Sequence, residues 1–137
     1  MSERSIAAYD VSQRVKTYDP DMELMHPNRS KMVQIAIEVL PFPRTAALRA
    51  IDLGIGTGYF TERFLNHFPN SRVLGMDGAQ AMIELAKARL TSLASRVEFV
   101  IGDFESCKNW VQAPARSMSC FLPMRFTTLV APTRRQW

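Results

Sequence analysis

The 137-residue sequence predicts an α/β fold in which a parallel sheet is flanked by helices. Apolar runs typical of strands alternate with amphipathic helical stretches, and a glycine-rich turn at residues 54–58 joins the first strand directly to a helix. Strands that alternate with helices pair in parallel through right-handed crossovers, so their carboxyl ends meet at one edge of the sheet. Each of the three predicted strands carries an aspartate at this end: Asp52, Asp77 and Asp103.

The chain before the turn predicts a polar lead-in and one helix. Residues 1–25 are polar, and the pair Asp19-Pro20 is typical of an irregular or only partly helical segment. Apolar residues then recur at helical spacing until Pro41 ends the pattern, so we expect a helix that covers one face of the sheet. These residues are Met32, Ile35, Ala36, Val39 and Leu40.

Residues 48–104 form the alternating part of the chain. The first strand, Leu48–Leu53, leads through the turn into a helix that reaches Phe68 and should bury Phe60, Phe64, Leu65 and Phe68. A second strand, Arg72–Met76, precedes Asp77 and an amphipathic helix between Ala79 and Leu93. The third strand is predicted at Arg96–Ile101.

Residues 105–137 break this alternation. They contain scattered prolines and arginines, and only Met118–Leu122 and Phe126–Val130 have the composition of short strands. We therefore expect an incomplete fold of about three strands plus an irregular C-terminal tail. Residues 1–104, with a cap at 1–40, would form the binding domain, and residues 105–137 an atypical basic tail.

Composition argues against several classes of protein. The net charge of +4 lies in the tail, because residues 1–104 carry 12 basic and 12 acidic side chains, so a nucleic-acid face on the folded part is not indicated. Cys107 and Cys120 are isolated, and we expect neither a metal site nor a disulfide framework. No apolar stretch approaches the ~20 residues of a membrane span, and Glu3 and Arg4 do not fit a signal peptide, so a cytoplasmic protein is expected.

The glycine turn is the strongest candidate for a binding site. Glycines at alternate positions leave one side of the turn without Cβ atoms, so a ligand can approach the backbone closely. The turn also lies between the carboxyl end of a strand and the start of a helix, where α/β proteins bind ligands. The alternative is that the glycines only allow the strand and the helix to pack tightly.

Two aspartates at neighbouring strand ends have the chemistry of nucleoside recognition. The Asp77 carboxylate can accept hydrogen bonds from both hydroxyls of a ribose, and its alternative role is to cap the following helix. Asp103 can accept the amino hydrogens of an adenine whose faces rest on Met82 and Phe104. The alternative interpretation of Asp103 is that it is an exposed aspartate in a turn without a ligand.

Asp52 and Tyr59 discriminate between nucleoside cofactors. A dinucleotide-binding turn has its third glycine where Tyr59 stands here, and an acid beside the turn would repel a pyrophosphate. Asp52 would instead attract a ligand with an ammonium or sulfonium group, and S-adenosylmethionine carries both. A nicotinamide-dependent oxidoreductase is therefore the least favoured alternative.

Three segments resemble the first three motifs of class I S-adenosylmethionine-dependent methyltransferases, which have a Rossmann-like fold. They are Asp-Leu-Gly-Ile-Gly-Thr-Gly at 52–58, Gly-Met-Asp-Gly at 75–78 and Val-Ile-Gly-Asp-Phe at 100–104. The resemblance covers residues 48–104, and residues 18–40 are similar to the family's amino-terminal cap more loosely.

The resemblance implies a role for each matching residue. The glycines would let the turn pass under the methionine part of the cofactor, Asp52 would lie near its amino group, and Asp77 would hold the ribose. Asp103 and the Phe104 backbone N–H would form hydrogen bonds with the adenine. Gly78 departs from the family pattern, in which a larger apolar residue commonly packs on the base. The implied cofactor-binding residues are Asp52, Gly54, Ile55, Gly56, Gly58, Asp77, Gly78, Met82, Asp103 and Phe104.

The family's fold continues with four further strands, one of them beside the first strand, and residues 105–137 do not resemble these elements. The sequence thus looks like a truncated or altered methyltransferase whose first strand has an open edge, and open edges invite association. We expect either Phe126–Val130 or Met118–Leu122 to cover this edge, or a second copy of the chain to do so in a homo-oligomer.

The implied function is methyl transfer to an unidentified acceptor, a small molecule or tRNA. Because the reaction is an in-line displacement at an activated methyl group, alignment in a dry cleft can supply much of the catalysis, and no catalytic residue is assigned. Tyr18 is expected to face solvent and His26 to stand at the start of a helix. The main alternative is a non-catalytic fragment whose basic, aromatic tail contacts a protein or RNA.

Overall fold

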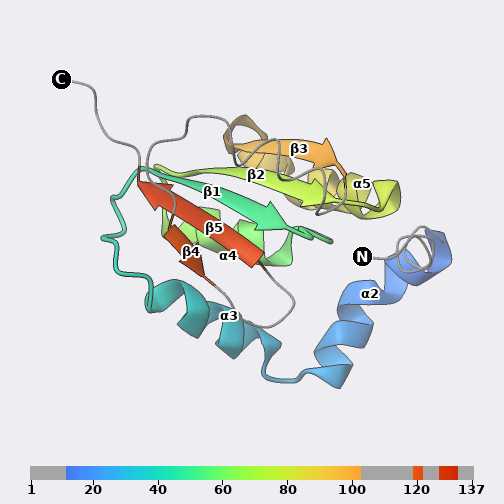
Figure 1. The fold of residues 1–137 in the computed structure, drawn as a ribbon. Helices are drawn as coiled ribbons and strands as arrows, with labels where there is room; N and C mark the ends of the chain where they lie inside the picture. The colour runs from blue at the N-terminus through green and yellow to red at the C-terminus, as the bar shows by residue number, and fades with distance from the viewer. Residues whose placement is uncertain (1–11, 103–118, 122–126, 133–137) are drawn as a thin grey trace.

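The computed structural model describes residues 12–102, 119–121 and 127–132, and within these ranges five strands form one sheet (Figure 1). The strand order is β3-β2-β1-β5-β4. The strands β1 (Leu48–Leu53), β2 (Arg72–Asp77) and β3 (Val97–Ile101) run parallel to one another. This part of the sheet confirms the incomplete Rossmann-like α/β fold that the sequence predicts.

Three helices lie on one face of this sheet. They are α3 (Arg29–Glu38), α4 (Tyr59–His67) and α5 (Gln80–Arg89), and a 3₁₀ helix, η1 (Thr91–Arg96), follows α5. The crossovers β1-α4-β2 and β2-α5-β3 step in the same direction across the sheet, so right-handed connections place α4 and α5 on the same side. The helix α3 packs against α4 there.

The main core lies between these helices and the sheet. Side chains alternate between the two faces of a strand, so Leu48 and Ala50 of β1 point toward the helices with Val73 of β2. Full burial of each large apolar side chain stabilises the fold by roughly 1.5–3 kcal/mol. The buried cluster consists of Ile37, Leu48, Ala50, Ile55, Phe64, Leu65, Phe68, Val73, Ile83, Ala86, Leu90 and Val97. The predicted α4 stripe is thus confirmed, with Phe60 only partly buried.

The lead-in is more regular than the sequence predicts. The helix α2 (Ser12–Met25) continues through Pro20, although a proline disfavours helical backbone angles at the residue before it. The side chains of Tyr18 and Asp19 pack on the α4–α5 side of the molecule. These tertiary contacts outweigh the local preference, so the helical alternative, and not the irregular one, holds for the described residues of this region.

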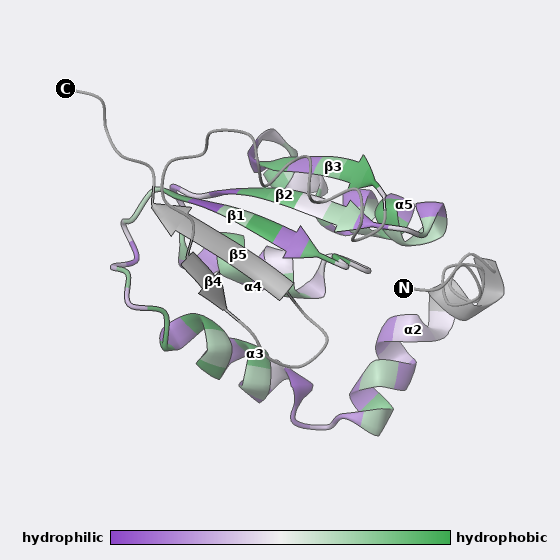
Figure 2. Cartoon of the chain, in the orientation of Figure 1, coloured by the Kyte–Doolittle hydropathy of each residue, from purple (hydrophilic) through white to green (hydrophobic). Residues whose placement is uncertain are grey.

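The helix α3 turns a different side toward the core than expected. Val33, Ile37 and Leu40 pack on the main cluster, whereas Met32, Ile35 and Val39 are exposed. Hydrophobic residues occur on more than one side of α3 (Figure 2), and periodicity alone does not determine which side is buried.

The C-terminal tail contributes two strands to the sheet. The strand β5 (Thr127–Pro132) pairs antiparallel with β1 along its whole length, from Leu48 opposite Pro132 to Leu53 opposite Thr127. The strand β4 (Ser119–Phe121) pairs antiparallel with β5. The prediction that the tail covers the open edge of β1 is therefore confirmed, and both described segments of the tail lie where the sequence predicts short strands.

None of the helices within the described ranges is long and apolar enough to cross a membrane. The division of the chain into a binding domain at 1–104 and a separate tail stays a prediction.

Candidate cofactor site

The three glycines of the turn between β1 and α4 have left-handed backbone angles, with φ of +78°, +53° and +77° at Gly54, Gly56 and Gly58. A Cβ atom on Gly54 would meet nothing within 4 Å, and one on Gly56 would meet only a carbonyl oxygen at 3.9 Å. A Cβ atom on Gly58 would instead lie 2.9 Å from Leu90 Cδ1. The first two glycines therefore border open space that a ligand can occupy, while the third allows the start of α4 to pack closely beside α5.

Three consecutive backbone donors at the start of the turn are bonded within the protein. The N–H groups of Gly54 and Ile55 donate to the Met76 carbonyl oxygen at 2.8 and 2.9 Å, and the Gly56 N–H donates to Asp77 Oδ2 at 2.9 Å. A phosphate-binding turn needs such donors directed at its ligand. These three donors are therefore not directed at a ligand, and the first part of the turn offers a Cβ-free surface instead.

Ile55 contributes to this site through its backbone. Its side chain is buried, and a Cβ atom on Gly75 would overlap Ile55 Cδ1. The missing side chain at Gly75 thus makes room for Ile55, which holds the turn against β2.

Asp77 joins the end of β2 to the turn and to α5. Its Oδ2 accepts the Gly56 N–H, and its Oδ1 accepts the Ala79 N–H at 3.0 Å at the start of α5. This bond closes a tight turn just before α5, whose N-cap is Ala79 and has no side-chain cap hydrogen bond, so Asp77 is not the helix cap that the sequence left as an alternative. Each carboxylate oxygen keeps a second lone pair that could accept a ribose hydroxyl. The Gly102 N–H also donates to the Asp77 carbonyl oxygen at 3.0 Å, which brings the end of β3 to the same edge. Asp103 and Phe104 lie outside the described residues.

Asp52 lies beneath the turn, on the helix side of the sheet. Its side chain is 2% exposed, and its Oδ2 accepts a hydrogen bond from Thr61 Oγ1 at 2.6 Å. Burial raises the pKa of Asp52 to about 6; the hydrogen bond from Thr61 opposes this shift and the charge of Asp77 adds to it. Asp52 therefore has a contact with α4, and its predicted contact with a cofactor amino group stays a prediction.

The other predicted binding residues and the cap lie beside α5. Gly78 is half-buried between β2 and α5, and Met82 is buried together with Ala79. Tyr18 of α2 packs on this pair and is half-buried between α2 and α5. The expectation that Tyr18 faces solvent is therefore wrong. His26 is exposed in the connection between α2 and α3, directly after the end of α2 and three residues before α3 begins.

A network of charged residues links α2, α3 and α5 to the turn. Asp19 Oδ1 accepts hydrogen bonds from Thr57 Oγ1 at 3.0 Å and from Arg29 Nη1 at 2.9 Å, and Asp19 Oδ2 accepts one from Arg89 Nη2. The guanidinium groups of Arg29 and Arg63 stack on the Tyr59 ring, 3.8 and 3.5 Å from its centroid. Sequence reasoning missed this network because the contacts of Asp19 join residues 10 to 70 positions apart and no local motif marks them.

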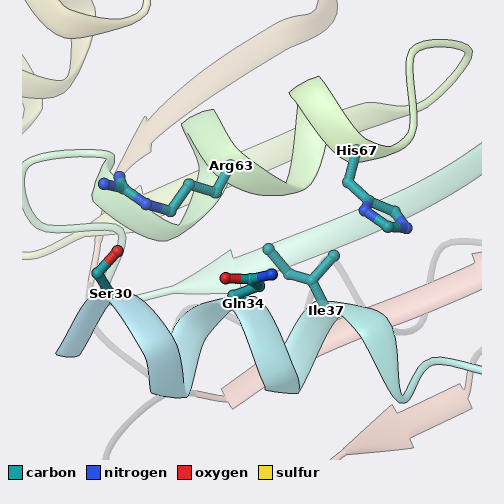
Figure 3. A pocket seen from close by; sticks show the side chains of 5 residues that line it. All are labelled: Ser30, Gln34, Ile37, Arg63 and His67. Atoms are coloured by element: carbon teal, nitrogen blue, oxygen red, sulfur yellow. The ribbon is translucent and has the colours of Figure 1, made fainter. Parts of the chain in front are cut away.

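A shallow groove of about 200 Å³ lies elsewhere, between α3 and α4 (Figure 3). Figure 3 shows Gln34 and Ile37 pointing from α3 toward α4, and His67 pointing back from the end of α4. The groove belongs to the helix layer and is not the strand-end site. Its lining residues are Ser30, Gln34, Ile37, Arg63 and His67.

These features define a class of protein. A parallel α/β sheet that has a glycine turn after one strand and a carboxylate at the end of the next binds a nucleoside cofactor at that edge. Residues 50–132 match a family described as "Methyltransferase domain". Because this match covers more than half of the chain, the chain belongs to this methyltransferase family, whose cofactor is S-adenosylmethionine.

Individual relatives agree with the family. A malonyl-[acyl-carrier protein] O-methyltransferase of Acetivibrio thermocellus is 31% identical over 108 residues, which are 79% of this chain and 36% of that protein. A trans-aconitate 2-methyltransferase of Variovorax paradoxus is 34% identical over 86 residues, covering 63% and 31% of the two chains. The chain thus spans about a third of the length of these relatives.

A solved structure also resembles the fold. One chain in the complex between the Haloferax volcanii Trm112 methyltransferase activator and a methyltransferase matches with a TM-score of 0.50 and 26% identity. The match covers 71% of this chain and 38% of that chain.

Proposed function

We propose that this chain binds S-adenosylmethionine at the edge formed by the glycine turn and Asp77 and serves methyl transfer to a carboxylate acceptor. The observation that carries the proposal is the open, Cβ-free surface at Gly54 and Gly56, held beside the Asp77 carboxylate by the 2.9 Å hydrogen bond from Gly56. At this surface the N–H groups of Gly54, Ile55 and Gly56 are already bonded, which favours a cationic nucleoside over a pyrophosphate there.

Each residue would contribute binding and orientation. Gly54 and Gly56 would let the methionine part of the cofactor lie against the backbone, and Asp77 would accept the ribose hydroxyls. Asp52 and Asp77 would place negative charge near the cationic end of the ligand. When bound, the cofactor supplies a methyl group that is already activated, so the chain's main task is to align it and exclude water. Asp103 and Phe104 stay predicted adenine contacts.

The acceptor class is supported by the relatives. The names of the two relatives described above specify malonyl-[acyl-carrier protein] and trans-aconitate as substrates, and both substrates are carboxylic acids. Transfer to a carboxylate oxygen needs no general base, because that oxygen carries no proton at neutral pH.

Calorimetry tests the cofactor proposal directly. The full chain should bind S-adenosylmethionine and S-adenosylhomocysteine, and Asp77→Asn should weaken both; NADH should give no heat. The exposed Asp21→Asn serves as the control, because it changes the charge equally on α2. Absence of heat with both methionine cofactors at millimolar concentration would refute the proposal.

A second measurement tests the acceptor. Transfer of a labelled methyl group to a panel of dicarboxylates and acyl thioesters should produce a base-labile methyl ester. Cofactor binding without any transfer would limit the function of this chain to cofactor binding. Binding to RNA through the basic tail, most of which lies outside the described residues, stays an alternative that salt-dependent RNA binding would support.

A further inference from the structure

Two consecutive residues of α2 contact both sides of the candidate site. Tyr18 packs on Ala79 and Met82, next to the start of α5, while Asp19 accepts a hydrogen bond from Thr57 in the glycine turn. The turn and the start of α5 are also the two segments that the Asp77 carboxylate joins. The cap therefore contacts the same pair of segments as the predicted ribose-binding residue, through different side chains.

The Asp19 carboxylate is held from three directions. Thr57 Oγ1 and Arg29 Nη1 donate to one oxygen, and Arg89 donates to the other. Arg89 is itself bonded to Glu62 Oε2 of α4 at 3.2 Å. Because the Asp19 side chain is only 22% exposed and each of its oxygens has a partner, its position relative to the turn is well defined.

Thr57 is the residue of the turn that contacts Asp19. It lies between two glycines with left-handed backbone and is 3% exposed. The preceding part of the turn is bonded to β2 through Met76 and Asp77, and Asp19 holds Thr57 from α2. A glycine-rich segment loses much conformational freedom when it is ordered, so an anchor that orders it beforehand improves ligand binding.

We propose that Asp19 is a positioning residue that fixes the glycine turn in its ligand-accepting conformation through Thr57, and so couples docking of α2 to cofactor binding. The proposal rests on the proposed function. The competing explanation is that Asp19 only attaches α2 to α5 through Arg89, in which case the Thr57 hydroxyl would not matter to binding.

A double-mutant cycle separates these explanations. In the full chain, the dissociation constant for S-adenosylhomocysteine should rise about tenfold in Asp19→Ala and in Thr57→Val, which corresponds to about 1.4 kcal/mol in each case. The double variant should bind no more weakly than Asp19→Ala, because both changes remove the same hydrogen bond. Thr57→Ser keeps the hydroxyl and should bind like the wild type, as should the exposed control Asp21→Ala.

Amide exchange in the free protein provides a readout that does not depend on the ligand. Asp19→Ala should speed exchange in residues 54–58 and leave residues 48–53 unchanged. Additive losses of about a hundredfold in the double variant, or a lower melting temperature in Asp19→Ala with unchanged affinity and unchanged exchange at 54–58, would overturn the inference. If the wild type fails to bind, the proposed function is wrong, and unchanged exchange at 54–58 would separately show that Asp19 does not hold the turn.

Discussion

Replacing the buried Asp52 with asparagine should stabilise the protein at neutral pH. Burial raises the pKa of Asp52 from 3.8 to about 6, so the folded state holds the proton more strongly than the unfolded state. The ionisation of Asp52 therefore lowers the free energy of unfolding as the pH rises from about 4 to 6, and the loss persists above pH 6. A shift of about two units corresponds to about 3 kcal/mol.

The asparagine side chain in Asp52→Asn would carry no charge and could still accept the hydrogen bond from Thr61. Loss of the charge-assisted part of that bond costs about 1 kcal/mol, so the net gain should be about 2 kcal/mol at pH 7.5. At pH 4.5 most of the wild-type carboxyl is protonated in the folded state, and the two proteins should differ little. The difference in stability should therefore depend strongly on pH.

Urea unfolding followed by circular dichroism at pH 4.5 and 7.5 measures this difference. The exposed Asp21→Asn on α2 is the control and should change stability little at either pH. If Asp52→Asn is no more stable than the wild type at pH 7.5, or gains the same amount at both pH values, burial does not control the ionisation of Asp52.

Three further predictions follow from the site and the sheet. Gly54→Ala should weaken S-adenosylhomocysteine binding at least tenfold in calorimetry with a modest loss of stability, whereas Gly58→Ala should mainly lower the free energy of unfolding, by about 2–3 kcal/mol, because its Cβ would crowd Leu90. If Asp52 faces the cofactor amino group, affinity should fall up to tenfold per pH unit below pH 6, and a flat profile between pH 5 and 7 would place the ammonium elsewhere. A chain ended at residue 118 lacks the strand that covers β1 and should associate in light scattering, where a monomer would contradict the edge argument.

The central fold could be predicted from the sequence because its signals are local. The apolar run at 48–53, the glycine turn and the amphipathic helix after it lie within a few residues of one another, and right-handed crossovers order the three parallel strands. The same logic predicts that the turn and Asp77 meet at one edge, and the hydrogen bond between Gly56 and Asp77 agrees with it.

What each glycine does could be decided only in three dimensions. The sequence offers ligand approach and tight packing as alternatives for the whole turn. The structure assigns one role to each glycine, because Gly54 borders open space while Gly58 lies against Leu90, directly after the end of α5.

Sequence reasoning alone identifies the parallel strands, the glycine turn and the family motifs, since each depends on neighbouring residues whose backbone preferences add up. Tertiary structure decided which side of α3 is buried, that residues 127–132 complete the edge of β1, and that Asp19 contacts Thr57. These outcomes depend on contacts between distant segments, which outweigh the local preference against helix at Pro20. In the tail, the strand composition agrees with the pairing to β1 but does not by itself specify the partner strand.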